Sequence, residues 1–556
     1  MNFFDFAWST VLRVTKKHYS EIKVLLHDDL KYPYLGRDEK GYVLHLIKPT
    51  KVDNAHVVFQ GLKFNLQNPT HKKIIWYLFK ASVYHLCLHA LFSDPTVYSK
   101  WARGKQLNLA AFVVSLVEDA IIDKNLRTHF GWMLPEIVYA NVISYLRMKR
   151  AEELSSDISR AMVSTLLNYN LGKIKGEVKN DLKVDIEAIT TMLQKIGEKP
   201  TADEKIGYAS KIYDALSVYG QTFEVPSLLH TESHGTNDMF YNTQIPKEEE
   251  IQAMFSETLQ ANKPADKRQN PIDEGEAGRA LTSWLEREKA QLKILREYME
   301  IGKNTQFEDF TFPAEDYAEY QRSKELLGSP VRRILHQLRL LKNITGEDFK
   351  QESGFIDLQE AIQVIASKSR RTDIFVREEL QTREDAWSIL IDASHSLSMF
   401  KGEVRGIALC LAEVARLLIL NQNSWGMYAF NNKFYIVKDF TERYDARVRA
   451  RIGGLTHGGF TYLPDAILLA AQALKGKLEE ARVLVVVSDF FPAGYDDAEE
   501  KLKEAVKKVE RMGVGIIGIG VNSSAVKRYI RTNCVVENPY DLIKKFTRAF
   551  IEFSSS

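Results

Sequence analysis

Between Ala386 and the C-terminus, short apolar runs rich in β-branched residues alternate with longer amphipathic runs. The apolar runs are AWSILID, SWGMYAF, KFYIVKD, ARVLVVVSD, VGIIGIG and NCVVE. They predict buried strands, and the amphipathic segments between most of them predict helices. The second and third runs are joined without a helix, at Asn431–Asn432, which predicts a hairpin. The pattern therefore predicts a doubly wound α/β domain, in which ligands bind at the carboxyl ends of the strands.

The chain has 556 residues, which is too many for one core, and the sequence before Ala386 has a different pattern. Amphipathic stretches at 72–93, 107–128 and 134–150 predict long helices, and GYVLHLIKP and AHVVFQGLKF predict strands. The expected organisation is a mainly helical N-terminal domain (1–226), a polar flexible linker (227–280), a helix-rich connector (281–385) and the α/β domain (386–556).

Composition excludes several classes of protein. The net charge is +2, from 75 basic and 73 acidic residues, which gives no general bias toward nucleic acid or membranes. The most apolar stretch, IIWYLFKASVYHLCLHALF, carries Lys80 and two histidines, which argues against a transmembrane helix. The start of the chain lacks the features of a signal peptide, and the three cysteines lie in apolar contexts, as free thiols do. We expect a soluble, cytoplasmic protein with no membrane insertion.

Oxygen-bearing side chains follow two of the predicted strands. Asp392 ends the first strand and is followed by Ser394 and Ser396, whereas Asp489 ends the fourth. Thr461 follows a Gly-Gly turn that leads into a helix. Carboxylates and hydroxyls without histidine or cysteine suit Mg²⁺ or Mn²⁺ better than zinc. The alternative for each hydroxyl is a helix N-cap, and a serine nucleophile is disfavoured because no G-x-S-x-G motif is present.

The motifs DASHS, GGFT and VSD resemble the metal-ion-dependent adhesion site of von Willebrand factor A (VWA) domains. The resemblance implies a divalent-cation site at these positions: Asp392, Ser394, Ser396, Thr461 and Asp489. It leaves a coordination position for a carboxylate from another molecule. One departure is SDFFP, where many relatives read TDG. The change keeps Asp489 but makes the next loop bulkier and more hydrophobic.

Residues 345–520 resemble the corresponding segment of NorD- and CbbO-type proteins, which are cousins of the cobalt-chelatase large subunits. Before Pro226 the resemblance is fragmentary, with VSLVEDAIIDKNLRTHFGWMLP similar to a helical EDARIE stretch. Members work with MoxR-type AAA+ ATPases to activate or remodel a metalloenzyme. The resemblance implies a non-catalytic adaptor with an ATPase partner and a client protein. The chain has no G-x-x-x-x-G-K-[ST] motif, so a partner must supply any ATP hydrolysis.

His85 and His89 lie one helical turn apart and are candidates for a second metal site. Zinc peptidases need H-E-x-x-H, and Leu86 occupies the position of the glutamate. Glu118 follows at a spacing typical of a third zincin ligand. The open alternatives are buried core histidines, a degenerate zincin-like scaffold and a zinc-dependent hydrolase. For the α/β domain, the alternative is a VWA scaffold that binds no metal.

Overall fold

The computed structural model divides into two compact units, Met1–Lys289 and Ala290–Ser556, each with its own core. The boundary falls within helix α9 (Glu274–Ile301). The described residues are 3–19, 21–39, 41–234, 238–261, 274–351, 355–367, 371–382, 385–419, 421–479 and 481–554.

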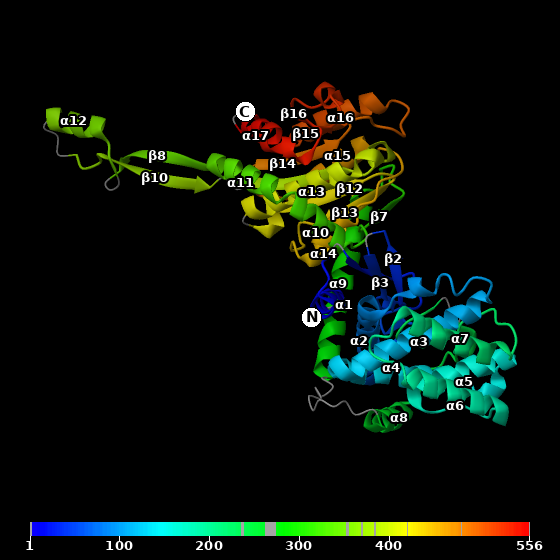
Figure 1. Ribbon diagram of the computed structural model, residues 1–556. Helices are drawn as coiled ribbons and strands as arrows, with labels where there is room; N and C mark the ends of the chain where they lie inside the picture. The colour runs from blue at the N-terminus through cyan, green and yellow to red at the C-terminus, as the bar shows by residue number, and fades with distance from the viewer. Residues whose placement is uncertain are drawn as a thin grey trace. The chain divides into compact units, whose positions relative to one another are not determined.

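The N-terminal unit is mainly helical, as its apolar periodicity predicts (Figure 1). The three long helices expected from the sequence are α2, α3 and α4. Helix α2 begins where it does because the Asn68 side chain accepts a hydrogen bond from the Thr70 amide, and Pro69 occupies the first turn. The helices of this unit are α1 (Phe3–Thr15), α2 (Pro69–Phe92), α3 (Leu107–His129), α4 (Leu134–Arg147), α5 (Asp157–Leu171), α6 (Asn180–Gln194), α7 (Ala202–Ser217) and α8 (Glu248–Ala261).

Two small sheets accompany these helices. One has the order β1-β3-β2, with β1 parallel to β3, and the other has the order β4-β5-β6. The sequence predicts β3, β5 and β6 but not the others. The tight turn between β5 and β6 is formed by Gln60 and Gly61, both with positive φ. The strands are β1 (Ile22–His27), β2 (Tyr34–Asp38), β3 (Gly41–Ile47), β4 (Thr50–Lys51), β5 (His56–Phe59) and β6 (Leu62–Asn65).

Helix α2 forms the centre of the N-terminal core. Among the described residues, it is the one helix long and apolar enough to cross a membrane, and 83% of its apolar window is buried inside the protein. Lys80, within the apolar part of the helix, forms an ion pair with Glu136 at 2.9 Å. Such burial is what a core helix of a globular unit requires.

Residues 227–234 do not behave as the flexible linker that their polar sequence suggests. Ser227, His230, Thr231 and Glu232 are buried in the N-terminal unit. Their polar groups have partners: Ser82 Oγ donates to the His230 carbonyl at 3.0 Å, and the Ser233 amide donates to the Pro33 carbonyl at 2.7 Å. A polar segment is stable inside a protein when its groups are hydrogen-bonded in this way. Residues 262–273 of the expected linker lie outside the described residues.

The C-terminal unit is built on a seven-stranded sheet with the order β16-β15-β14-β11-β12-β13-β7. Neighbouring strands are parallel except β12 and β13, which form the hairpin predicted at Asn431–Asn432. The six predicted strands are therefore confirmed, as is the doubly wound α/β arrangement. The strands are β7 (Asp309–Thr311), β11 (Asp385–Asp392), β12 (Trp425–Phe430), β13 (Lys433–Lys438), β14 (Ala481–Ser488), β15 (Gly515–Val521) and β16 (Thr532–Val536).

Helices cover both faces of this sheet (Figure 1). The central strand β11 is buried along its whole length, with Trp387 and Ile389 facing one core and Ala386 and Leu390 the other. One core includes residues of α10 (Tyr317–Leu326), α11 (Gly328–Lys342), α13 (Lys401–Leu418), α14 (Ala446–Gly453) and α17 (Leu542–Ser554). The other includes residues of α15 (Leu463–Lys475), α16 (Ala498–Arg511) and the end of α9.

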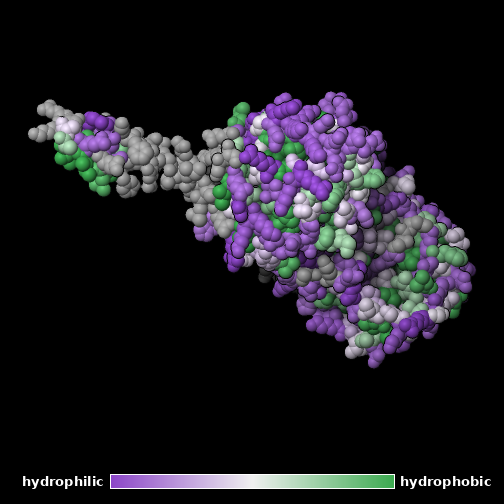
Figure 2. Space-filling model, turned by 90° about the horizontal axis from the view of Figure 1, so that it is seen from above, coloured by the Kyte–Doolittle hydropathy of each residue, from purple (hydrophilic) through white to green (hydrophobic). Residues whose placement is uncertain are grey.

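The expected helical connector also contains strands. β7 adds an edge to the large sheet beside β13. β8 (Asn343–Gln351) and β10 (Phe375–Thr382) form a long antiparallel hairpin with the short β9 (Phe355–Ile356). Helix α12 (Leu358–Ser367) lies at the end of the hairpin, and Leu358, Ile362 and Ile365 are exposed on it. Figure 2 shows this apolar surface in green.

The segment before α10 packs tightly against the end of α14, which ties the connector to the C-terminal unit. A Cβ atom at Gly454 would lie 1.8 Å from the Ala314 carbonyl oxygen. We expect Gly454→Ala to lower the free energy of unfolding by about 1–3 kcal/mol, because backbone must move to make room. Thermal unfolding of the full chain measures the effect.

Gly476→Ala is the matched control. Gly454 and Gly476 each cap the C-terminus of a helix, with φ of −86° and −84°. A Cβ atom at Gly476 meets nothing within 4 Å. Equal melting temperatures for the two variants would contradict the close packing at Gly454.

Candidate metal centre

Asp392 is the buried centre of the predicted site at the carboxyl edge of the sheet. It is the last residue of β11, and the parallel register with β14 places it beside Ser488. Ser488 Oγ donates to Asp392 Oδ2 at 2.6 Å, and the Ser394 amide donates to Oδ1 at 2.8 Å. The carboxylate is therefore held in one orientation at the point where the central strand ends.

Ser394 and Ser396 follow in the turn that leads into helix α13. Their hydroxyl oxygens lie 3.0 Å apart. Ser394 is buried and Ser396 is exposed, so the pair runs from the protein interior to the solvent. Leu397, which is 1% exposed, fixes the turn by packing into the core below it. This arrangement points a row of oxygens outward from Asp392.

Three backbone contacts hold the loop that carries Thr461. The Gly458 amide donates to the Ala393 carbonyl at 2.9 Å, and the His395 amide donates to the Gly459 carbonyl at 3.1 Å. Asn432 Oδ1 accepts from the Phe460 amide at 2.5 Å. Gly459 has φ of +75°, and a side chain there would collide with Asn432. The Gly-Gly turn therefore brings Thr461, which is 3% exposed, to the same edge as the serines.

Asp489 follows the end of β14 and approaches Asp392 closely enough to affect its ionisation. Burial and the negative charge of Asp489 raise the pKa of Asp392 to about 7, although hydrogen bonds from Ser394 and Ser488 oppose the shift. Phe490 has φ of +58°, an unusual conformation for a bulky side chain, and it is fully buried. Core packing at Phe490 thus fixes the backbone directly after Asp489.

The structure therefore places all five predicted residues at one edge of the sheet, on three loops joined by hydrogen bonds. Two further residues support them: Ser488 orients Asp392, and Asn432 holds the Thr461 loop. Sequence reasoning missed both. The hydroxyl before Asp489 and the asparagine in the predicted hairpin were the available signals.

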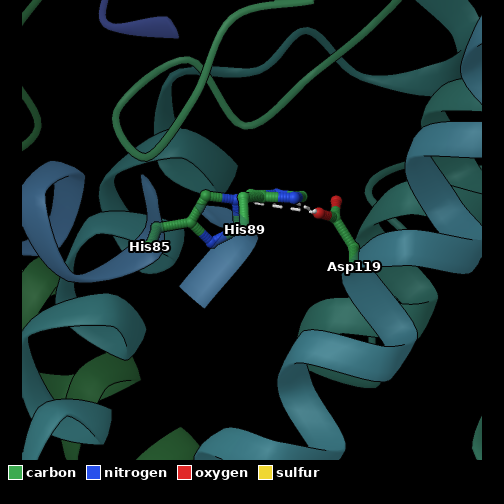
Figure 3. A group of neighbouring side chains, drawn as sticks. All are labelled: His85, His89 and Asp119. Atoms are coloured by element: carbon green, nitrogen blue, oxygen red, sulfur yellow. Dashed lines mark hydrogen bonds and ion pairs between the residues drawn. The ribbon is translucent and has the colours of Figure 1, made fainter. Parts of the chain in front are cut away.

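His85 and His89 in the N-terminal unit form a cluster with an acidic residue other than the expected Glu118. His85 and His89 lie on one face of α2, and Figure 3 shows them turned toward Asp119 on α3. Glu118, the residue expected from the spacing, faces elsewhere and contacts Lys205 and Tyr98, each at 2.8 Å. Adjacent residues of a helix point about 100° apart, which explains the difference. Asp119 replaces Glu118 as the candidate.

Comparisons with known proteins give limited matches. No family model matches the chain. Uncharacterized protein PA0525 of Pseudomonas aeruginosa is 25% identical over 174 residues, covering 28% of this chain. The match spans 28% of the length of that protein, well short of the whole.

Three solved structures show a partial likeness. The manganese-loaded TRAP protein of Plasmodium vivax matches 27% of this chain and 61% of its own, at 15% identity and a TM-score of 0.21. An aerotolerance-related membrane protein from Bacteroides fragilis matches 25% of this chain and 67% of its own, at 15% identity and a TM-score of 0.17. The RO (RSR) protein of Deinococcus radiodurans matches 81% of this chain and 86% of its own, at 11% identity and a TM-score of 0.19. The description of the C-terminal unit as an α/β domain rests on its own strand order.

The raised pKa of Asp392 makes a prediction about stability in the absence of added metal. In the folded chain this carboxyl holds its proton up to about pH 7, against an ordinary value of 3.8. Its contribution to stability is therefore present below about pH 4 and is lost as the pH rises toward 7. We expect Asp392→Asn to remove this loss, so that the variant in EDTA is more stable than the wild type at pH 8.

Thermal unfolding of both proteins at pH 5 and pH 8 in EDTA measures the difference. The control is Asp496→Asn, because Asp496 is exposed. We expect the gain of the Asp392 variant at pH 8 to be on the order of a few kcal/mol. A variant that is no more stable than the wild type at pH 8 would show that the charge pair costs nothing.

Proposed function

We propose that the C-terminal unit is a VWA-type domain that binds Mg²⁺ or Mn²⁺. The ligands are the five oxygen-bearing residues at the sheet edge: Asp392, Ser394, Ser396, Thr461 and Asp489. The observation that carries the proposal is the fully buried Asp392 carboxyl at the sheet edge, next to serine hydroxyls whose oxygens lie 3.0 Å apart and subject to the charge of Asp489. A divalent cation compensates this concentration of negative charge, and oxygen ligands suit these two ions.

The surface around this edge supports a role in binding a protein. Four large apolar side chains, from the loops that carry the site, are solvent-exposed. We call them the apolar rim: Met399 (88% exposed), Phe400 (36%), Phe460 (54%) and Phe491 (59%). Exposed apolar groups around a charged centre are typical of an interface, where they exclude water from the polar contact. A partner carboxylate would complete the shell of the ion while apolar groups beside it contact the rim.

The proposed role is that of a non-catalytic adaptor. The VWA-type domain engages one protein, and the chain couples a MoxR-type AAA+ ATPase to a client, such as a metalloenzyme complex. Two features support this role: the resemblance to NorD- and CbbO-type proteins, and the absence of a phosphate-binding loop from the sequence. The ATPase supplies the energy, and the cation-dependent contact supplies the attachment.

Removing the Thr461 hydroxyl tests the metal site. Thr461→Val keeps the shape of the side chain but removes an oxygen ligand. We expect the affinity for Mg²⁺ and Mn²⁺ to fall by more than about tenfold in isothermal titration. Capture of the MoxR-type ATPase from the same organism should be lost both in this variant and in EDTA.

The matched control is Thr441→Val, which removes a hydroxyl that donates to Asp439 at 2.6 Å in the same unit. If the wild-type chain shows no heat with either ion, the domain is a metal-independent scaffold. If it binds the ions but captures the ATPase equally well in EDTA, the metal bridge is wrong.

Changing the apolar rim separates partner binding from metal binding. We expect the double variant Phe460→Ser, Phe491→Ser to bind Mg²⁺ as the wild type does, because neither side chain offers a ligand atom. Its affinity for the ATPase should fall by about tenfold or more, as it does when anchors of an interface are truncated. Leu478→Ser is the control, since Leu478 is fully exposed in the loop before β14, at the opposite edge of the sheet. Equal ATPase affinity in both proteins would remove the rim from the interface.

A further inference from the structure

We propose that the N-terminal unit holds a second metal ion, a transition-metal dication such as Zn²⁺, between His85, His89 and Asp119, with Glu232 beside the two histidines. This site differs in chemistry from the oxygen site of the C-terminal unit and is independent of it. Imidazole nitrogens favour zinc and related ions over magnesium. Two histidines and one carboxylate are the three protein ligands of some zinc sites, in which a water takes the fourth position.

The geometry of the donor atoms of His85, His89 and Asp119 carries the proposal, and Glu232 contacts both histidines. His89 Nε2 lies 3.0 Å from His85 Nε2, 3.1 Å from Asp119 Oδ1 and 2.8 Å from Glu232 Oε2. His85 Nε2 lies 3.6 Å from Asp119 Oδ1 and 3.4 Å from Glu232 Oε2. Four ligands about 2.0–2.1 Å from a tetrahedral zinc ion are separated from each other by about 3.3 Å. The three separations among His85, His89 and Asp119 scatter around that value, so these three atoms are placed to hold one ion, and Glu232 contacts both histidines beside them.

Further hydrogen bonds orient His89 and its neighbour Glu232. His89 Nδ1 lies 2.7 Å from Ser93 Oγ, and donation from this nitrogen leaves the lone pair of Nε2 free for a metal. Glu232 Oε1 accepts from the Leu35 amide at 3.3 Å, which directs Oε2 toward the histidines. Metal-binding histidines and carboxylates are generally oriented by such second partners.

The segment that carries Glu232 is held in place by residues that are distant in the sequence. His230 Nδ1 lies 2.8 Å from Gln60 Oε1, and His230 Nε2 lies 2.7 Å from Arg147 Nη1. These contacts hold the turn that brings Glu232 to the two histidines of α2. The glutamate is 6% exposed, so the site is formed by the fold and not by a surface cluster.

A small cavity reaches the cluster from one side. Its volume is about 30 Å³, enough for a water molecule, and His85, Asp119, Glu232 and His234 are among its lining residues. The His234 ring lies 6.5 Å from that of His89, between centroids. The cavity therefore leaves room for a water or another small ligand on the bound ion.

Protons offer the alternative explanation for the close contacts. Burial alone would lower the pKa of His89, because it disfavours the positive charge. The negative charges and hydrogen bonds of Glu232 and Asp119 have the larger combined effect and raise this pKa to about 10. A buried imidazolium between two carboxylates would then hold the cluster together without metal. Direct measurement of zinc binding separates these two cases.

The test uses the full-length chain, dialysed against EDTA and then titrated with ZnCl₂ alone. We expect one equivalent of zinc to bind, with elemental analysis confirming the stoichiometry after gel filtration. His85→Ala and Asp119→Asn should each weaken binding by more than about tenfold, and Ser93→Ala by about tenfold through loss of the hydrogen bond to His89. Circular dichroism checks that each variant is folded.

Two controls make the result specific. His129→Ala removes an exposed histidine outside the cluster and should bind zinc as the wild type does. Asp392→Asn alters only the other site and should also retain zinc, so a failure of the magnesium proposal does not affect this one. No zinc bound by the wild type, or equal affinity in His85→Ala, Asp119→Asn and the wild type, would overturn the proposal in favour of a proton-linked cluster.

Discussion

The buried Asp392 carboxylate is the constraint around which the C-terminal unit is arranged. It lies at the end of the central strand, where burial and the nearby charge of Asp489 raise its pKa to about 7. A buried charge facing another of the same sign is unfavourable unless hydrogen bonds or a cation compensate it. Ser488 and the Ser394 amide supply part of that compensation. The loops with Thr461 and the serines complete a surface to which a cation can add the rest.

Local patterns in the sequence predict the sheet because each strand is encoded by its own apolar run. The six predicted strands and the hairpin at Asn431–Asn432 need no knowledge of distant residues. Strand β7 was not predictable in this way, since its three residues become a strand only by pairing with β13. Residues 227–234 show the same limit. Their polarity indicates exposure, whereas their partners, such as Ser82 and Pro33, lie more than a hundred residues away.

The two candidate metal sites show which ligands can be predicted from the spacing of residues in the sequence and which cannot. The oxygen residues of the C-terminal unit could be predicted because each follows a strand end or a Gly-Gly turn, and parallel strands bring such ends together. Glu118 was a wrong choice because spacing along a chain does not tell which way a helix faces. Glu232 could not be found from spacing at all, since the fold brings it to α2 from the segment expected to be a linker.

The conformation of Phe490 has a consequence for how this edge of the sheet meets a partner. Its backbone is in a region that few bulky residues adopt, and its side chain is locked in the core. A movement of the backbone at Phe490 would expose that ring, so core packing favours the conformation of this edge that the structure shows. Under the adaptor function proposed above, a preformed surface would distinguish partners chiefly by how long each stays bound, so their dissociation rates would differ more than their association rates.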